Sequence, residues 1–331
     1  MSGVQQITIG DDDGDQRFDR WFKKHFPEIN HGRLEKLLRT GQVRLDGKRA
    51  KASDRIVAGQ IVRVPPIAPA QDADRPKIAP KPKPVSERDA KTLRDAVLYK
   101  DADVLVIDKP AGLAVQGGTG LDKNLDAMLD SLKFDAAERP RLVHRLDKDT
   151  SGVLVLARNA KAARELAEAF RHKSARKIYW AVVVGIPKPD RGTIDAPLSK
   201  HAGGYGERVG IDEEEGRHAV TRYAMIERAG NRAAWVALMP ETGRTHQLRA
   251  HCVILGTPIV GDGKYGGVDA HLARENLSRQ LHLHARSIRI PHPRKGWIEA
   301  TAPLPPHMKA TWKFFDFSPE PDHDPFADLG R

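Results

Sequence analysis

The stretch His144-Arg145-Leu146-Asp147-Lys148-Asp149-Thr150-Ser151-Gly152 decides how this sequence is interpreted. It separates the apolar pair Leu142-Val143 from the apolar run at residues 153–156, so we expect a charged loop that leads into a buried strand. Two explanations fit a carboxylate in such a loop. Either Asp149 or Ser151 caps backbone N–H groups at a structural corner, or Asp147 is a nucleophile.

Short apolar runs alternate with amphipathic segments on both sides of this loop. The runs at residues 104–107, 153–156, 179–184 and 281–290 predict strands. Residues 160–170 and 245–255 have the apolar spacing of helices. The pattern therefore predicts a sheet protein of the α/β or α+β class.

A small basic unit precedes this region. Residues 15–75 carry 14 Lys and Arg against 8 Asp and Glu, a net charge of +6 out of +11 for the whole chain. We expect helices near residues 17–25 and 31–38, the second with Asn30 as its N-cap and Gly41 after its end, followed by short strands. Such concentrated positive charge, with a pI near 9.7, favours a nucleic-acid partner.

Composition also suggests where the units end. The string Pro76-Lys77-Ile78-Ala79-Pro80-Lys81-Pro82-Lys83-Pro84 predicts an extended spacer within a linker at residues 76–92. A larger unit follows at residues 93–317. Residues 1–14 and 318–331 are polar and poor in apolar side chains, so we expect flexible tails there.

Five strings in the larger unit occur in a characteristic order. They are Gly112-Leu113-Ala114-Val115-Gln116, the stretch from His144 to Gly152, Arg176-Lys177-Ile178-Tyr179, Gly243-Arg244-Thr245-His246-Gln247-Leu248-Arg249 and His282-Leu283-His284-Ala285. Together they resemble the RluA-type RNA pseudouridine synthases. The earlier string Arg33-Leu34-Glu35-Lys36-Leu37-Leu38-Arg39-Thr40-Gly41-Gln42-Val43-Arg44-Leu45-Asp46-Gly47-Lys48 resembles an S4 RNA-binding module.

The combined resemblance is to the RluC and RluD branch and implies an α+β fold. A small N-terminal S4 (αL-like) domain would precede a catalytic domain built on a mixed, mainly antiparallel sheet with flanking helices. It also implies an isomerase that converts specific uridines of large-subunit (23S) ribosomal RNA to pseudouridine without a cofactor. The uridine must leave its stack to react, so a pocket is needed.

The resemblance assigns roles to individual residues. Asp147 would attack either C1′ of the ribose or C6 of the base. Tyr179 would stack on the base and could remove a proton, Arg244 would keep Asp147 ionised, and Arg145 would fill the space that the base leaves. Further pocket residues would be Leu248, Arg249 and His144. The predicted phosphate contacts in the S4-like unit are Arg33, Lys36, Arg39, Arg44 and Lys48.

Two other functions remain open for the sequence. A catalytically silent RNA-binding factor in ribosome assembly would keep the basic unit without the reaction. A glycoside hydrolase would need a second acid, such as Asp149, facing Asp147. The favoured hypothesis is an RluC-like enzyme, with an RluD-like one as the alternative, acting as a cytoplasmic monomer on ribosomal RNA or a ribosomal precursor particle.

Several classes are disfavoured. His246, His251, His282 and His284 show no metal-site spacing and no cysteine cluster accompanies them, so we expect no metal. Gly117-Gly118-Thr119-Gly120 lacks the spacing of a dinucleotide loop. The single cysteine, Cys252, cannot form an internal disulfide and is expected to be buried. No apolar run approaches the length of a membrane span, so we expect no membrane association.

Overall fold

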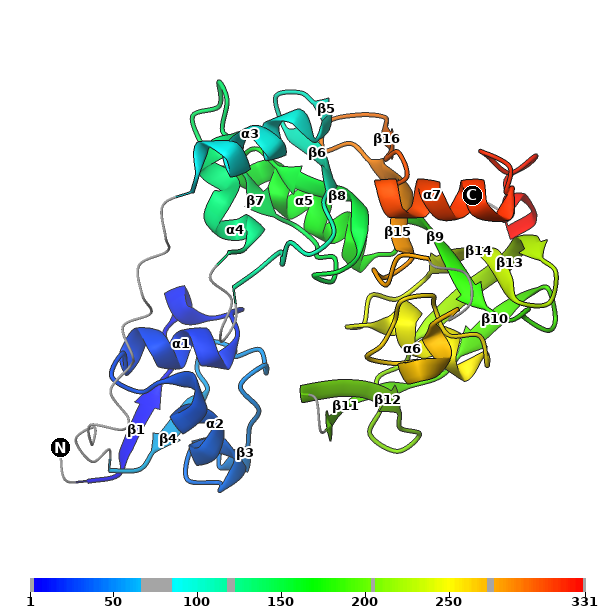
Figure 1. The fold of residues 1–331 in the computed structure, drawn as a ribbon. Helices are drawn as coiled ribbons and strands as arrows, with labels where there is room; N and C mark the ends of the chain where they lie inside the picture. Colours follow the sequence, from blue (N-terminus) through cyan, green and yellow to red (C-terminus); the bar gives the residue numbers. More distant parts are fainter. Residues whose placement is uncertain (1–2, 67–84, 118–122, 204–205, 273–276, 330–331) are drawn as a thin grey trace. The chain divides into compact units, whose positions relative to one another are not determined.

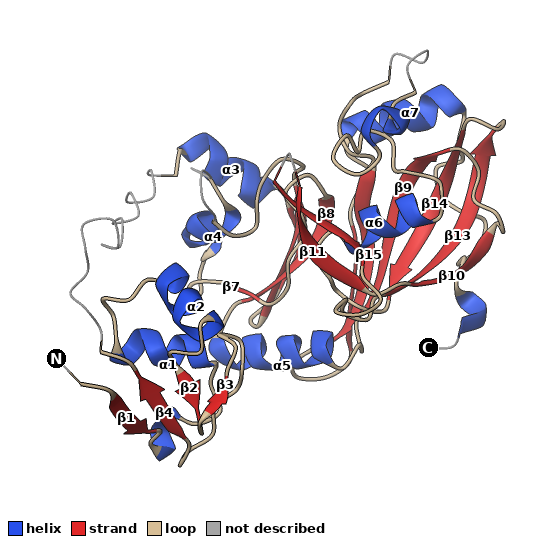
Figure 2. Cartoon of the chain, turned by 90° about the horizontal axis from the view of Figure 1, so that it is seen from below, coloured by secondary structure: helices blue, strands red, loops and turns tan. Residues whose placement is uncertain are grey.

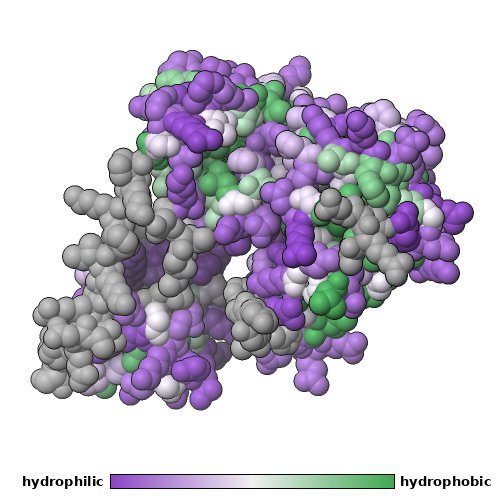
Figure 3. Space-filling model, viewed as in Figure 1, coloured by the Kyte–Doolittle hydropathy of each residue, from purple (hydrophilic) through white to green (hydrophobic). Residues whose placement is uncertain are grey.

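The chain forms two compact units, Met1–Lys81 and Pro82–Arg331 (Figure 1). The computed structural model describes residues 3–66, 85–117, 123–203, 206–272 and 277–329. The predicted Pro-Lys spacer at residues 76–84 lies outside the described residues. No helix in these ranges is long and apolar enough to cross a membrane, and the visible surface is largely hydrophilic (Figure 3).

The first unit packs two helices on a small sheet. Helices α1 (Phe18–His25) and α2 (His31–Arg39) bury Phe18, Trp21 and Phe22 among other apolar side chains. The predicted cap of α2 is confirmed, since the Asn30 side chain accepts a hydrogen bond of 2.8 Å from the backbone N–H of Arg33. The sheet has the order β1-β4-β2-β3, with strands β1 (Gln5–Thr8), β2 (Arg44–Leu45), β3 (Lys48–Arg49) and β4 (Ile61–Val64).

The expectation of a flexible tail at residues 1–14 is wrong over its described part. Strand β1 pairs antiparallel with β4, with Gln5 opposite Val64. Ile9, which follows β1, is only 1% exposed in the core of the unit. One apolar anchor and a strand register therefore fix a segment whose composition is mostly polar.

The second unit is built on a ten-stranded sheet. Its main order is β10-β13-β14-β9-β15-β8-β6-β5, with β16 paired to β15 and β7 to β8. The strands are β5 (Val97–Lys100), β6 (Val104–Lys109), β7 (Arg141–Leu142), β8 (Ser151–Ala157), β9 (Arg176–Val184), β10 (Arg191–Asp195), β13 (Val220–Ala229), β14 (Ala233–Pro240), β15 (Leu283–Pro291) and β16 (Trp297–Thr301). A separate hairpin joins β11 (Leu198–Gly203) to β12 (Gly206–Ile211).

Helices cover both faces of this sheet (Figure 2). They are α3 (Glu87–Asp95), α4 (Leu125–Met128), α5 (Ala160–Arg171), α6 (Gln247–Ile254) and α7 (Pro306–Phe315). Alternate residues of β9 contact different helices: Val183 packs in the cluster with Leu248 of α6, and Trp180 packs in the cluster with Trp312 of α7. The predicted mixed, mainly antiparallel α+β architecture is confirmed.

The centre of the sheet contains its one parallel pairing among the described strands. Strand β8 runs parallel to β15, with Ser151 opposite His284 and Gly152 opposite Ala285. All other described pairs are antiparallel. The loop that carries Asp147 enters β8 at this junction, so the two halves of the sheet meet beside it.

Two predicted boundaries of the second unit differ from the structure. Most of residues 85–92, assigned to the linker, belongs to α3, which Ser86 caps by accepting from the N–H of Asp89. The described part of the C-terminal tail, residues 318–329, packs on the sheet through Phe326, which is 3% exposed. Its aspartates pair with strand arginines, as in the Arg176–Asp324 contact of 2.7 Å.

Candidate active site

Asp147 lies on the loop between β7 and β8. The buried side chain of Leu146 anchors this loop, and the N–H of Thr150 donates to the carbonyl oxygen of Asp147 at 3.2 Å. Gly152, the second residue of β8, has φ +108, and a Cβ at this position would lie 2.2 Å from the carbonyl oxygen of Ala285. Glycine is therefore required where the loop enters the junction of β8 and β15.

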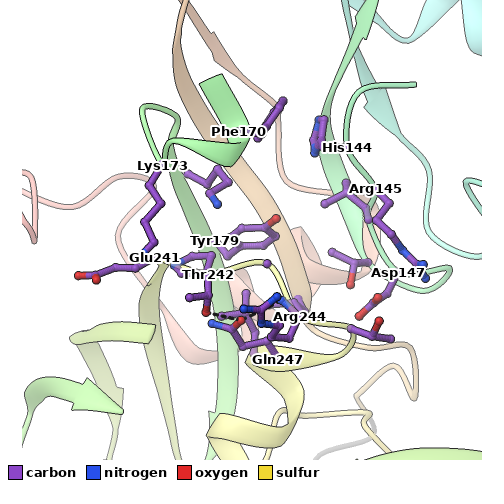
Figure 4. A pocket seen from close by; sticks show the side chains of 18 of the residues that line it. His144, Arg145, Asp147, Phe170, Lys173, Tyr179, Glu241, Thr242, Arg244 and Gln247 are labelled. Carbon is purple, nitrogen blue, oxygen red and sulfur yellow. Dashed lines mark hydrogen bonds between the residues drawn. The ribbon is translucent and has the colours of Figure 1, made fainter. Parts of the chain in front are cut away.

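A pocket of about 510 Å³ opens beside Asp147, a size typical of small-molecule sites. Asp147, Tyr179 and Arg244 reach it from the loop before β8, from β9 and from the turn before α6 (Figure 4). Of the seven predicted catalytic and pocket residues, the six that line it are His144, Arg145, Asp147, Tyr179, Arg244 and Leu248. Arg249 is buried and does not line it.

Tyr179 presents its ring to the pocket from β9. Burial, with a smaller contribution from the negative charge of Asp147, raises the pKa of its phenol well above the usual value. The hydroxyl is therefore protonated at neutral pH. Tyr179 provides an aromatic wall and a neutral polar group facing the carboxylate.

Gln247 holds the turn before α6 in place. Its side-chain oxygen accepts from the backbone N–H of Arg244 at 3.0 Å and from the hydroxyl of Thr242 at 2.7 Å. Its amide donates to the carbonyl oxygen of Val220 at 2.9 Å. The intervening His246 has a left-handed backbone, with φ 52. These hydrogen bonds therefore fix the backbone of the turn that carries Arg244 and His246.

His246, which the sequence gave no role, is the neighbour of the Asp147 carboxylate. Its Nε2 atom lies 3.9 Å from Oδ1 of Asp147, and its Nδ1 atom lies 2.7 Å from the hydroxyl of Tyr265. Burial lowers the pKa of His246, although the charge of Asp147 opposes this. The distinguishing feature of His246 is its left-handed backbone in the turn before α6. Such a backbone conformation cannot be recognised from the sequence.

The arginine that was predicted to hold Asp147 is oriented differently. Arg244 is exposed, its Nε donates to the carbonyl oxygen of His218 at 3.1 Å, and it makes no ion pair with Asp147. Arg249 instead is buried and forms a two-point pair with Asp262, at 2.8 and 2.6 Å. The hydrogen bond and charge of Asp262, with a weaker effect of Asp147, raise the pKa of Arg249 against the opposing effect of burial.

His144 forms one end of the pocket together with Phe170. Its Nε2 accepts a hydrogen bond of 2.8 Å from the backbone N–H of Val155, and its ring stacks on Phe170 at 4.3 Å. Burial, together with the positive charge of Lys177, lowers the pKa of His144 to about 3. The imidazole is therefore neutral and carries its hydrogen on Nδ1.

Lys109 holds the loop of Asp147 through hydrogen bonds to backbone carbonyl oxygens. This fully buried lysine donates from Nζ to the carbonyl oxygens of Pro110, Leu113 and Lys148 at 2.9, 2.9 and 3.0 Å. Burial lowers its pKa to about 8, while nearby aspartates including Asp147 and Asp149 act in the opposite direction. In the sequence Lys109 ends β6, two residues after the apolar run at 104–107 and directly before Pro110.

Among the described residues, one cluster of His and Asp side chains is close enough together to hold a metal ion. The cluster of Asp101, Asp103 and His292 is the one found, and it lies away from the pocket lining. Its acceptors already have donors, since Asp101 receives the hydroxyl of Tyr99 at 2.6 Å and His292 at 2.8 Å. The strand histidines are likewise engaged: His284 bonds Ser151 at 2.9 Å and His282 bonds Thr311 at 2.8 Å.

The predicted phosphate contacts lie on α2 and the strands after it. Lys36, Arg39 and Lys48 are exposed, and Arg33 is half-buried. Arg44 is exposed, but its guanidinium donates to the carbonyl oxygens of Gly41 and Gly47, both at 3.1 Å. Arg44 therefore also shapes the turn. Cys252 is buried and free, as expected.

Comparison with known proteins finds relatives of this chain over most of its length. Residues 103–253 match the family described as RNA pseudouridylate synthase. The ribosomal large subunit pseudouridine synthase C of Pasteurella multocida (strain Pm70) is 38% identical over 92% of each chain, and that of Vibrio vulnificus (strain CMCP6) is 37% identical over 91% of this chain and 93% of its own. The structure of human RNA pseudouridylate synthase domain containing 4 aligns with a TM-score of 0.58 and 31% identity, over 70% of this chain and 97% of that one. This chain belongs to the RNA pseudouridylate synthase family.

Proposed function

We propose that this chain converts uridines of large-subunit ribosomal RNA to pseudouridine, with Asp147 as the nucleophile. The observation that carries the proposal is the Asp147 carboxylate on the wall of a pocket of about 510 Å³, faced by the protonated phenol of Tyr179, while the other acid of the lining, Glu241, is paired with Arg222. The large-subunit target comes from relatives that are named ribosomal large subunit pseudouridine synthase C. Those names favour an RluC-like over an RluD-like enzyme.

The reaction needs only groups that this pocket can supply. The C1′–N1 bond of the uridine breaks, the uracil turns within the pocket, a C1′–C5 bond forms, and the hydrogen on C5 leaves as a proton while N1 gains one. Asp147 attacks C1′ or C6 and is released at the end, so the aspartate is regenerated. Reactant and product are isomers, and no co-reactant is consumed.

Neighbouring residues would divide the remaining tasks. Tyr179 would hold the face of the uracil as a neutral wall, because its phenol is too weakly acidic to be ionised beforehand. Arg249, held in place by Asp262, would stabilise the negative charge of the Asp147 carboxylate. Arg244 would stay at the pocket lining, where its guanidinium is not paired with Asp147. Arg145, exposed beside the pocket, would occupy the space of the extruded uridine.

The N-terminal unit would bind RNA by charge. We propose an S4-like domain at residues 15–75 and a catalytic domain at residues 93–317, acting as a cytoplasmic monomer on ribosomal RNA or a precursor particle. Lys36, Arg39 and Lys48, all exposed, would set affinity and register through phosphates, with Arg33 and Arg44 beside them.

The test is to map pseudouridines across ribosomal RNA from cells with and without this chain. We expect one or more large-subunit sites to disappear on deletion, to return with the wild-type chain, and not to return with Asp147→Ala. Identical maps with and without the chain, together with retained RNA affinity, would support the assembly-factor hypothesis instead. The positions of the lost sites decide between RluC-like and RluD-like activity.

A further inference from the structure

One end of the pocket carries positive charge without a matching acid. Lys177 lies on β9 two residues before Tyr179, and both residues line the pocket. Residues two apart on a strand share a face at a spacing of about 6.8 Å. Lys173, just after α5, lines the same region, and Figure 4 shows it on the other side of Tyr179 from Asp147.

The side chain of Lys177 has no hydrogen-bond or ion-pair partner among the described residues. The acid on this wall, Glu241, is already paired with Arg222. Burial lowers the pKa of the Lys177 ammonium, and the charge of Lys173 lowers it further. Two neighbouring cations, one of them half-buried, destabilise each other until an anion binds.

The aromatic pair beside Lys177 does not change this balance. His144 stacks on Phe170 and is neutral, since the Lys177 charge and burial both oppose its protonation. It adds no third cation, and its Nε2 is occupied by the N–H of Val155. His144 therefore contributes no charge at this end, where Lys173, Lys177 and Arg171 line the pocket.

We propose that Lys177, with Lys173 beside it, binds the phosphate attached to the target uridine. The inference rests on the proposed function and names a substrate contact within the same pocket. With C1′ or C6 held at Asp147 and the uracil against Tyr179, a phosphate on the ribose would lie within reach of Lys177, one strand repeat of about 6.8 Å from Tyr179. An ammonium on a flexible stem suits this task, because it accepts a phosphate as a point charge while the nucleotide rearranges.

The first experiment compares uridine with uridine 5′-monophosphate and uridine 3′-monophosphate, bound to the full chain and measured by NMR titration. The wild type should prefer one nucleotide over uridine by about tenfold, the effect of one charge-assisted contact. Lys177→Met should abolish that preference and Lys177→Arg should retain it. Lys161→Met, an exposed lysine of α5 outside the pocket, is the matched control and should behave as wild type.

A second measurement uses RNA with a mapped target uridine. In Lys177→Met the slope of log affinity against log salt should fall by about 0.7, as for one lost phosphate contact on a single strand. KM should rise more than kcat falls. Equal binding of uridine and both nucleotides by the wild type, or an unchanged preference in Lys177→Met, overturns the inference. Unchanged pseudouridine maps would overturn the proposed function alone, because nucleotide binding is measured without turnover.

Discussion

The Nε2 atom of His246 lies 3.9 Å from the Oδ1 atom of Asp147, and among the described residues no other basic side chain comes within 4.0 Å of that carboxylate. The Tyr265 hydroxyl receives the backbone N–H of Val209 at 3.0 Å, which leaves its own hydrogen for Nδ1 of His246 at 2.7 Å. We infer that the hydrogen of the neutral imidazole lies on Nε2, facing Asp147. Tyr265 would thereby orient a donor toward the nucleophile.

Replacing His246 should slow the reaction without weakening RNA binding. Asparagine tolerates the left-handed backbone at this position but is too short to reach Asp147. We expect His246→Asn to lower kcat about tenfold with KM nearly unchanged, and Tyr265→Phe to have a smaller effect in the same direction. Steady-state kinetics on a target RNA measure both constants. A raised KM at normal kcat would mean that His246 binds RNA instead.

Asp147 and its neighbour Asp149 form a matched pair for testing the nucleophile. Asp147→Asn keeps the size of the side chain but removes its nucleophilic charge, so pseudouridine formation should become undetectable. Asp149 is exposed and does not line the pocket, so Asp149→Asn should change the rate by no more than about twofold. Tritium release from [5-³H]uridine-labelled RNA measures both. A large loss in Asp149→Asn would revive a mechanism with two paired acids.

Arg249 and Arg244 should differ sharply in their effects on stability. Arg249→Met leaves Asp262, which is 1% exposed, as an unpaired buried carboxylate, and should lower the free energy of unfolding by about 3–5 kcal/mol. Arg244→Met, at an exposed site, should change it by less than about 0.5 kcal/mol. Urea titration measures the difference.

A double variant separates structure from catalysis at this site. Arg249→Met combined with Asp262→Leu removes both buried charges and should recover much of the stability. If Arg249 also stabilises the ionised Asp147, activity should stay low in the refolded double variant. Recovery of wild-type activity would show that Arg249 acts only in folding.

The contrast between these arginines shows how far sequence could predict the site. The charged loop between two apolar runs drew attention to Asp147 without choosing between a structural corner and a nucleophile. Strand alternation predicted only that Tyr179 lies on a strand, and the resemblance to the RluA-type synthases assigned both residues their roles. Which arginine of the Gly243–Arg249 string is buried could not be predicted from local sequence. Arg249 is buried because it pairs with Asp262, thirteen residues further along the chain. His246 depended on a hydroxyl from Tyr265 and a backbone turn, neither of which has a sequence signature.

The prediction of flexible chain ends was wrong over the described residues for a similar reason. Residues 318–329 are rich in Asp and Pro, which suggested a flexible tail, yet Phe326 inserts into the cluster around Trp312. Asp328 then pairs with Arg191 of β10 at 2.7 Å. One apolar side chain outweighs the average composition when a complementary surface is present, and that surface is made by distant strands.

Gly152 should be intolerant of any side chain. A methyl group there would meet the backbone of Ala285 at 2.2 Å, in a conformation with φ +108 that alanine rarely adopts. We expect Gly152→Ala to disrupt the β8–β15 junction and to abolish activity with loss of stability. Gly296, with φ +81 but no atom within 4 Å of an added Cβ, is the control. Gly296→Ala should cost only about 1 kcal/mol of backbone strain, so equal losses would contradict the steric argument.

Stability should fall in mild acid because of buried neutral histidines. Burial lowers the pKa of His282 and of His284 to about 4, below the ordinary value near 6.5. Between these values the unfolded chain binds protons that the folded chain does not, so the free energy of unfolding decreases as the pH falls from about 6.5 to about 4. Urea titrations followed by near-ultraviolet circular dichroism of the Trp180–Trp235–Trp312 cluster report on this unit. His284→Gln should flatten the dependence, whereas His172→Gln, at an exposed site, should leave it unchanged. An equally steep loss in His284→Gln would place the acid sensitivity elsewhere.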